Sequence, residues 1–155
     1  MEIRRAEERD IDQILNLLSQ VLEIHAKIRP DIFVSGTTKY TREELSLLIT
    51  NSSYFVYVVC EEDIILGYAF CKIVSPKHIN TMVNNKTFFI DDFCVDEKYR
   101  KQHIGTILFE FLKKEAKNFG CYEICLYQWE GNDDARKFYE KMGKKVKATT
   151  LEFII

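Results

Sequence analysis

Two adjacent carboxylates, Asp91 and Asp92, lie within an otherwise apolar run from Thr87 to Val95. The run is rich in aromatic and β-branched residues, which favours a β-strand, and adjacent positions of a strand face opposite sides of the sheet. A charge inside a sheet is costly unless it is paired. The two side chains are therefore either at an edge or salt-bridged, or one of them is a general base whose pKa is tuned by its site.

A charged turn at residues 96–106 follows this run and leads into a long helical pattern. The first backbone N–H groups of a helix have no intrahelical partner and lie at the positive end of the helix dipole, so they can hold a phosphate or pyrophosphate. Gly105 permits a close approach, and Lys98, Arg100 and Lys101 add positive charge. Most strand-to-helix turns bind nothing, so an ordinary connection is the other interpretation.

A third segment begins at Asn132 and contains Ala135, Phe138 and Tyr139 at helical spacing. Tyr139 is either a core aromatic of this helix or a proton donor with an ordinary pKa near 10. The spacing alone does not separate these two roles.

Apolar periodicity, capping residues and turn residues predict the elements that position these groups. Asp10 and Gln13 predict a capping box at the start of the first helix, and Thr41 and Glu44 predict another at the second. The order is β-α-α-β-β-β-α-β-α-β, which is an α/β or α+β layered domain. The expected elements are a strand at 3–5, helices from 10 and from 41, strands at 54–61, 64–74 and 87–95, a helix at 104–119, a strand at 122–127, a helix at 132–142 and a last strand at 151–155.

The chain has 155 residues, 46% hydrophobic and 30% charged, which is typical of a single globular domain spanning residues 1–155. Its net charge of −2 argues against nucleic acid as the main partner. The apolar stretch Tyr54–Cys60 has seven residues, whereas a membrane helix needs about 20. The N-terminus lacks the apolar core of a signal peptide, so we expect a cytoplasmic protein that does not associate with membranes.

The five cysteines form no Cys-x-x-Cys pair, and most of them lie in strand-like apolar runs. Buried free thiols are therefore expected. His25 and His78 have no ligand partners at metal-binding spacing, so no metal is expected.

Taken together, these segments resemble the GNAT superfamily of acyl-CoA-dependent N-acyltransferases. The order of elements agrees with the family along nearly the whole chain, and the specific motifs cover about residues 88–143. No motif is decisive singly, and the resemblance rests on their order and spacing. The matching segments are Phe89-Ile90-Asp91-Asp92-Phe93-Cys94-Val95, Tyr99-Arg100-Lys101-Gln102-His103-Ile104-Gly105-Thr106 and Asn132-x-x-Ala135-x-x-Phe138-Tyr139-x-x-x-Gly143.

The resemblance implies the GNAT fold, a mixed and largely antiparallel central sheet flanked by helices, with acetyl-CoA as co-substrate. The cofactor would lie in a V-shaped gap where two central strands, here 88–95 and 122–127, splay apart. The first strand would pair with its pantetheine arm, the turn would wrap its pyrophosphate, and Tyr139 would face its sulfur. The implied cofactor-binding residues are Phe93, Cys94, Val95, Arg100, Lys101, Gln102, His103, Ile104, Gly105, Thr106, Asn132 and Tyr139.

The turn departs from the family pattern at one position. The family usually reads Arg/Gln-x-x-Gly-x-Gly/Ala, and here His103 replaces the first Gly while Arg100 and Gly105 are kept. A side chain at that position needs a compatible backbone angle or a small shift of the loop. Because the phosphate donors are main-chain groups, cofactor binding is still expected.

The implied reaction is direct acetyl transfer to a primary amine in a ternary complex. At pH 7 an ammonium with a pKa of about 10.4 leaves roughly one molecule in 2,500 as the free amine, so a base assists the attack. Asp91 aligns with the acidic position of the family strand and is the first candidate, with Asp92 the second. Tyr139 would protonate the leaving thiolate, and a main-chain N–H near Val95 would stabilise the oxyanion.

The acceptor is expected to meet the first two helices, the loop between them and the loop at 75–86. The motif half resembles diamine acetyltransferases in its acidic pair and in the stretch from Trp129 to Tyr139, which suggests a polyamine or another small cationic amine. The residues expected on the acceptor side are His25, Arg29, Asp31, Phe33 and Tyr40.

Two alternative functions stay open. One is a protein or peptide N-acetyltransferase, and the other is a non-catalytic acyl-CoA-binding regulatory module. The apolar segment Leu151–Ile155 also predicts a homodimer, because an exposed apolar edge strand favours pairing with another chain.

Overall fold

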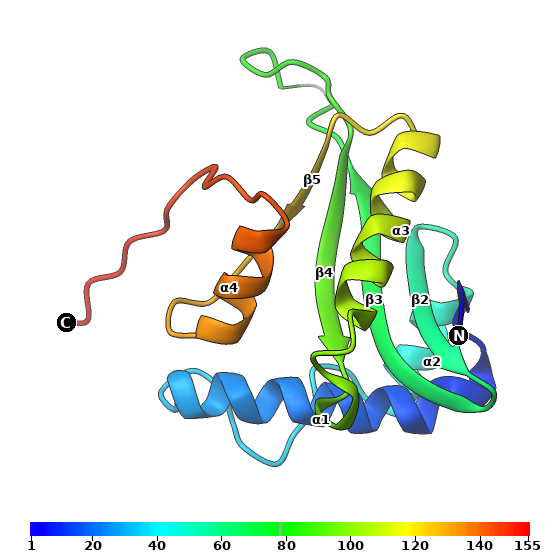
Figure 1. Ribbon diagram of the computed structural model, residues 1–155. Helices are drawn as coiled ribbons and strands as arrows, with labels where there is room; N and C mark the ends of the chain where they lie inside the picture. Colours follow the sequence, from blue (N-terminus) through cyan, green and yellow to red (C-terminus); the bar gives the residue numbers. More distant parts are fainter. Residues whose placement is uncertain (78) are drawn as a thin grey trace.

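A five-stranded sheet with the strand order β1-β2-β3-β4-β5 forms the centre of the molecule (Figure 1). The computed structural model describes residues 1–77 and 79–155, so the metal prediction for His78 lies outside the described residues. Neighbouring strands are antiparallel except β4 and β5, which are parallel, and this confirms the mixed, largely antiparallel sheet. The strands are β1 (Glu2–Arg5), β2 (Tyr54–Glu61), β3 (Ile64–Val74), β4 (Thr87–Val95) and β5 (Glu123–Leu126).

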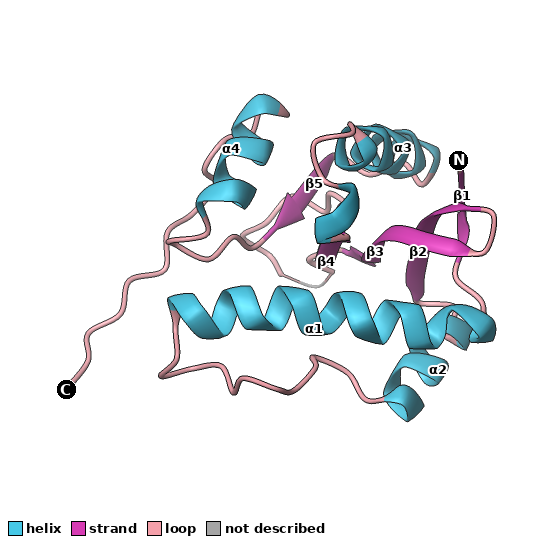
Figure 2. Cartoon of the chain, turned by 60° about the horizontal axis from the view of Figure 1, so that its bottom comes forward, coloured by secondary structure: helices cyan, strands magenta, loops and turns pink. Residues whose placement is uncertain are grey.

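Four helices cover the two faces of the sheet. The helices α1 (Ile11–Ile28) and α2 (Arg42–Thr50) lie on one face, and α3 (Ile104–Asn118) and α4 (Asp133–Lys141) lie on the other (Figure 2). Short 3₁₀ turns precede α1 at Glu8–Asp10 and follow β4 at Glu97–Tyr99. Each face has its own core. Under α1 and α2 the buried side chains include Ile14, Leu18, Tyr68 and Phe70, and under α3 and α4 they include Phe88, Leu108, Leu112 and Tyr139.

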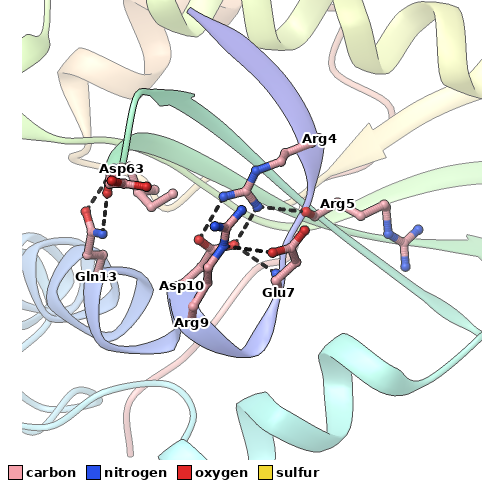
Figure 3. Close-up of polar contacts among 8 residues, drawn as sticks. Arg4, Arg5, Glu7, Arg9, Asp10, Gln13 and Asp63 are labelled. Atoms are coloured by element: carbon pink, nitrogen blue, oxygen red, sulfur yellow. Dashed lines mark hydrogen bonds and ion pairs between the residues drawn. The ribbon is translucent and has the colours of Figure 1, made fainter.

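The start of α1 is confirmed, but the predicted capping box between Asp10 and Gln13 is wrong. Gln13 instead donates to the Asp63 carbonyl at 2.8 Å and accepts from the Ile65 amide at 2.9 Å, which ties the helix to the β2–β3 turn (Figure 3). The Asp10 carboxylate is already taken by the guanidinium of Arg4, at 2.6 and 2.9 Å. A charged donor from β1 therefore outcompetes the local cap.

The predicted last strand at Leu151–Ile155 is wrong, because residues 142–155 form neither helix nor strand. A strand exists only where a neighbour accepts its backbone hydrogen bonds, and this tail runs away from β5 (Figure 1). Its apolar side chains are exposed, Phe153 to 86% and Ile154 to 84%. The strand order of a single chain therefore ends at β5.

None of the helices in the described part of the chain is long and apolar enough to cross a membrane. Within those same residues, no group of three or more His, Cys, Asp and Glu side chains is placed to hold a metal ion. All five cysteines are free thiols, with Cys60, Cys71 and Cys94 buried and Cys121 and Cys125 half-buried.

Gly67 allows the closest approach between β3 and β4. An added Cβ would lie 2.6 Å from the Cys94 carbonyl oxygen and 3.3 Å from Val59 Cγ1. We expect Gly67→Ala to lower the free energy of unfolding by about 1–3 kcal/mol, because the two strands must move apart to admit the methyl group. Urea-induced unfolding measures this change.

Val59→Ala in the Gly67→Ala background is the control for that experiment. The clash is with the backbone, so removing the Val59 side chain is not expected to restore stability. An unfolding midpoint of Gly67→Ala equal to that of the wild type would contradict the prediction.

Candidate active site

The strands β4 and β5 part after four residue pairs. Thr87 to Ile90 of β4 pair with Glu123 to Leu126 of β5, and the remaining half of β4 continues to Val95 without a partner in β5. Figure 1 shows β5 turning away from β4 toward α4. The expected splay of the two central strands is therefore present, and it leaves one backbone edge of residues 91–95 without a strand beside it.

The backbone of Phe93 and Val95 faces this unpaired side. The Asp96 amide donates to the Leu66 carbonyl of β3 at 2.9 Å, and the Cys94 carbonyl lies against Gly67 of the same strand. Because backbone groups of successive strand residues point in opposite directions, Phe93 and Val95 point away from β3. Cys94 differs from them, since its backbone faces β3 and its thiol is buried near the Leu17 carbonyl at 3.8 Å.

The turn after β4 contains two residues in the left-handed backbone region. Lys101 has a φ of 63° and His103 a φ of 62°, and both side chains are exposed, as is that of Gln102. His103 therefore adopts the left-handed conformation that a glycine would favour. Of the two possibilities expected from the sequence, a compatible backbone angle or a shifted loop, the structure has the compatible angle. The turn therefore keeps the left-handed conformation at position 103 without a glycine, at the cost of some backbone strain.

The first turn of α3 opens toward solvent at its N-terminus. His103 is the N-cap residue but its side chain makes no capping hydrogen bond, and among the described residues no side chain accepts from the amides of Ile104, Gly105 and Thr106. Ile104 anchors this turn in the core, and Thr106 is half-buried. An added Cβ at Gly105 would lie 3.3 Å from the Phe138 ring, so this position has little room for a side chain. These amides are donors that could hold an anion, as the first amides of a helix can.

Arg100 connects this turn to the unpaired edge of β4. Its Nε donates to the Val95 carbonyl at 3.1 Å. Asn132 faces Arg100 across a cavity of about 350 Å³, and its side chain caps α4 by accepting from the Ala135 amide at 3.2 Å. A second cavity of about 440 Å³ lies between α1 and the turn at 97–100 and also has Arg100 in its lining. Both cavities are also lined by Ile24 and Lys27 of α1.

Tyr139 lies deep in the splay within an aromatic cluster. Its ring centroid is 5.1 Å from that of Phe138, 6.1 Å from Phe109 and 6.4 Å from Phe93. No hydrogen bond to its hydroxyl occurs among the described residues, although no fully buried side-chain oxygen or nitrogen there lacks a partner. The hydroxyl therefore reaches open space. Burial, followed by the charge of Asp92, raises the pKa of Tyr139 above its usual range, so the phenol stays protonated.

The two carboxylates converge, which corrects the expectation that they face opposite sides. The β3–β4 register shifts between Phe70 and Cys71, so that Asp91 is an extra residue in β4 and only Asp92 keeps a partner. A bulge of this kind breaks the alternation of side chains. Both carboxylates face Lys39, whose Nζ lies 2.9 Å from Asp91 Oδ2 and 3.6 Å from Asp92 Oδ2.

The surroundings push the pKa values of these two carboxyls apart. Burial alone raises the pKa of Asp91, but the hydrogen bond from Tyr40 at 2.6 Å and the Lys39 ammonium outweigh it and hold that pKa below its usual value. Asp92 is more deeply buried, and burial raises its pKa despite a hydrogen bond from Tyr68 at 3.1 Å. With its pKa lowered, Asp91 is suited to remain an anion, and with its pKa raised, Asp92 is suited to accept a proton.

Two of the residues expected on the acceptor side, His25 and Phe33, belong to an aromatic cluster with Trp129. Phe33 packs against His25 at 5.2 Å and against Trp129 at 5.1 Å between ring centroids. Burial lowers the pKa of His25, and the charge of Asp92 opposes that shift, so His25 is within electrostatic reach of the carboxylates. Arg29 pairs instead with Asp31 and Glu152 at the surface.

Sequence reasoning missed Lys39 and Tyr68. A single lysine in a loop carries no local pattern, and a tyrosine inside an apolar strand has the pattern of a core residue. Only the bulge in β4 brings the partners of these two side chains together.

The Acetyltransferase (GNAT) family profile matches residues 18–144 of this chain. A probable glucosamine 6-phosphate N-acetyltransferase of Drosophila melanogaster is 28% identical over 147 residues, covering 92% of this chain and 60% of the relative. A glucosamine 6-phosphate N-acetyltransferase of Arabidopsis thaliana is 33% identical over 63 residues, covering 41% of this chain and 40% of the relative. The chain thus spans 40% and 60% of the lengths of these curated relatives.

Among solved structures, a mutant of the BH1408 protein from Bacillus halodurans has a TM-score of 0.95 and 31% sequence identity. That alignment covers 100% of this chain and 99% of the other. The arrangement of elements described above is therefore shared along the whole chain.

Proposed function

The chain belongs to the GNAT family of acetyltransferases, and on that premise we propose that it transfers an acetyl group from acetyl-CoA to the primary amine of a small molecule. The observation that supports the proposal is the splay of β4 and β5, which leaves one edge of β4 unpaired; the uncapped N-terminus of α3 and the Tyr139 hydroxyl are the groups that would act beside it.

The residues around this space fit acetyl-CoA. The amides of Ile104, Gly105 and Thr106 supply uncapped donors for a pyrophosphate, and Arg100 adds a positive charge beside them. The Phe93 carbonyl and the amides of Phe93 and Val95 offer strand-like hydrogen bonds to a pantetheine arm, whereas the Val95 carbonyl already accepts from Arg100 Nε. Bound there, acetyl-CoA supplies the activated acyl group, and the residues of the chain supply orientation and proton transfer.

Asp92 is a better candidate for the base than Asp91, which the family resemblance ranks first. Asp91 is held as an anion by Tyr40 and Lys39, and its lowered pKa makes it a weak proton acceptor. The raised pKa of Asp92 brings that carboxyl closer to the range in which a base is effective, and its charge acts on Tyr139. In this assignment Asp91 binds the ammonium, Asp92 accepts its proton, and Tyr139 donates a proton to the departing sulfur.

The acceptor class rests on two independent indications. The acidic pair favours an amine that arrives as a cation, as the resemblance to diamine acetyltransferases suggests. The curated relatives bear the name glucosamine 6-phosphate N-acetyltransferase, which points to an amino sugar phosphate. A diamine and an amino sugar phosphate are both small primary amines. We therefore propose a small primary amine as the acceptor and include both compounds in the assay.

The test is a thiol-release assay with acetyl-CoA and a panel of amines. The panel contains 1,4-diaminobutane, spermidine, glucosamine 6-phosphate, an aminoglycoside and a lysine peptide. We expect release that depends on a small amine and exceeds the hydrolysis rate without amine by at least about 100-fold. Turnover of the peptide alone would indicate a peptide acetyltransferase, and acetyl-CoA binding without turnover of any amine would indicate a binding module.

The replacement of the usual glycine by His103 leads to a prediction about cofactor affinity. His103→Gly keeps the left-handed conformation without a Cβ, so we expect it to bind acetyl-CoA at least as tightly as the wild type. His103→Val should weaken binding about tenfold, because a β-branched residue is strained at a positive φ. Isothermal calorimetry measures both, and equal affinities of the Gly and Val variants would contradict the prediction.

A homodimer through the tail is also proposed. The apolar side chains of the segment Leu151–Ile155 are exposed, and β5 is an edge strand with one unpaired side. The unpaired backbone N–H and C=O groups of β5 in one copy could therefore pair with the tail of a second copy. Sedimentation should give a dimer for the full chain and a monomer for a chain that ends at Ala148, whereas a monomeric full chain would refute the proposal.

A further inference from the structure

The ammonium group of Lys39 is seated in the acidic pair of the active site. Its Nζ lies 2.9 Å from Asp91 Oδ2 and 3.6 Å from Asp92 Oδ2, and it donates to the Asp91 carbonyl oxygen at 2.8 Å. A primary ammonium has three N–H donors. Two acceptors of Asp91 lie within hydrogen-bond distance and the Asp92 carboxylate adds an ion-pair contact, so the bulge of β4 surrounds an ammonium group that comes from the same chain.

We propose that Lys39 is the resident occupant of the ammonium subsite of the acceptor, and that a primary alkylammonium binds by displacing it. The inference deepens the proposed function and rests on it for the identity of the incoming amine. Two carboxylates face one lysine, so a unit of negative charge is left over and favours a cationic head group over a neutral or anionic one. The exchange replaces one ammonium by another in the same set of acceptors.

The segment that carries Lys39 is held at a separate point, so release of the lysine does not detach it. Ser35 and Gly36 both donate to the Glu23 carboxylate of α1, at 2.8 and 2.6 Å. The Lys39 side chain is 38% exposed, compared with 18% for Asp91. The ammonium therefore has a path to solvent, whereas the carboxylate stays in place.

The single tryptophan of the chain reports on this segment. Phe33, between α1 and Lys39, packs edge-on against Trp129 with 5.1 Å between ring centroids. Amine binding that shifts the Phe33 side of the Ser35–Gly36 anchor changes the surroundings of the indole, and calorimetry detects binding that leaves this anchor in place. Tryptophan fluorescence is thus a readout that does not depend on acetyl-CoA or on turnover.

The experiment titrates 1,4-diaminobutane into the full chain without acetyl-CoA, followed by Trp129 fluorescence and by calorimetry. Lys39→Met removes the competing ammonium and should lower the dissociation constant about tenfold relative to the wild type. Lys39→Arg keeps the charge and should stay within about twofold. Lys114→Met, which removes an exposed lysine of α3, is the matched control for the change in net charge. The neutral 1,4-butanediol should show no saturable binding.

Two outcomes would overturn the inference: Lys39→Met binding the diamine no more tightly than the wild type, or no saturable binding by calorimetry to either chain. Lys39→Gln, which keeps a polar side chain, repeats the measurement if the Met variant melts at a lower temperature. The thiol-release assay separates this inference from the proposed function. If Lys39→Met binds the diamine more tightly but no thiol is released, the ammonium subsite is supported and the transferase function is rejected. If thiol is released but Lys39→Met binds the diamine as the wild type does, the transferase function is supported and the displacement of Lys39 is rejected.

Discussion

Tyr139→Phe is expected to lower kcat at least about 100-fold while leaving the affinity for acetyl-CoA within about twofold of the wild type. The substitution removes one oxygen from a ring whose carbon atoms pack against Phe93, Phe109 and Phe138, so the aromatic cluster keeps its volume. The hydroxyl makes no hydrogen bond within the described residues, so its loss leaves no partner unsatisfied. The expected loss is therefore confined to proton donation.

The pH dependence sharpens this expectation. The pKa of Tyr139 is raised by burial and by the Asp92 charge, so the phenol is protonated throughout the range in which the assay is run. The pH–rate profile of the wild type should therefore show no decrease caused by ionisation of Tyr139 below a pH of about 10, the usual pKa of a tyrosine. Tyr122→Phe, at an exposed tyrosine, is the control. A Tyr139→Phe enzyme with wild-type kcat would remove this residue from the reaction.

The largest effect on stability is expected from Arg4→Met. The Arg4 and Asp10 side chains are 18% and 4% exposed, and their two hydrogen bonds are 2.6 and 2.9 Å long (Figure 3). Removing the guanidinium leaves a buried carboxylate without its counter-charge, which costs about 3–5 kcal/mol of unfolding free energy. Urea-induced unfolding at pH 7 measures the loss.

The pH profile of that variant identifies the cause. Burial alone raises the pKa of Asp10, but the hydrogen bonds from Arg4 and from the Glu7 amide lower it overall. In the wild type this carboxylate therefore contributes stability that is present above its unfolded pKa of about 3.9 and is lost as the pH falls through its lower folded pKa. In Arg4→Met the folded pKa rises, so the deficit should shrink as the pH approaches 4.

Two controls accompany this measurement. Arg4→Met/Asp10→Asn removes the buried charge as well and should recover part of the loss. Arg42→Met breaks an exposed pair with Asp12 and should cost less than about 1 kcal/mol. Equal losses in Arg4→Met and Arg42→Met would show that burial of the Arg4–Asp10 pair is not what matters.

Local patterns predicted most of the fold. The apolar periodicity around Leu108 and the Thr41 and Glu44 capping box mark helices that the structure confirms, and the strands expected at 54–61 and 64–74 are present as the antiparallel pair β2 and β3. These features depend on residues close in the sequence. The splay of β4 and β5 was expected from the family resemblance rather than from any local pattern.

What the sequence did not predict depends on distant partners. The bulge at Asp91 arises from the pairing of β4 with β3, and it alone turns two neighbouring carboxylates toward Lys39. The tail failed as a strand for the same reason, since its apolar residues have the composition of a strand but no neighbour within the chain. The family resemblance ranked Asp91 above Asp92 as the base because Asp91 aligns with the acidic position of the family strand, whereas the difference in burial between the two depends on the bulge.

Arg100 belongs to the linings of both cavities, of about 350 and 440 Å³, while its Nε is bound to the Val95 carbonyl. The hydrogen bond holds the Arg100 side chain where the two cavities share it as a lining residue. An anion that draws the guanidinium away from Val95 would free the Val95 carbonyl, which is a hydrogen-bond acceptor on the unpaired edge of β4. Anion binding beside Arg100 would in this way expose an acceptor for the amides of an incoming ligand.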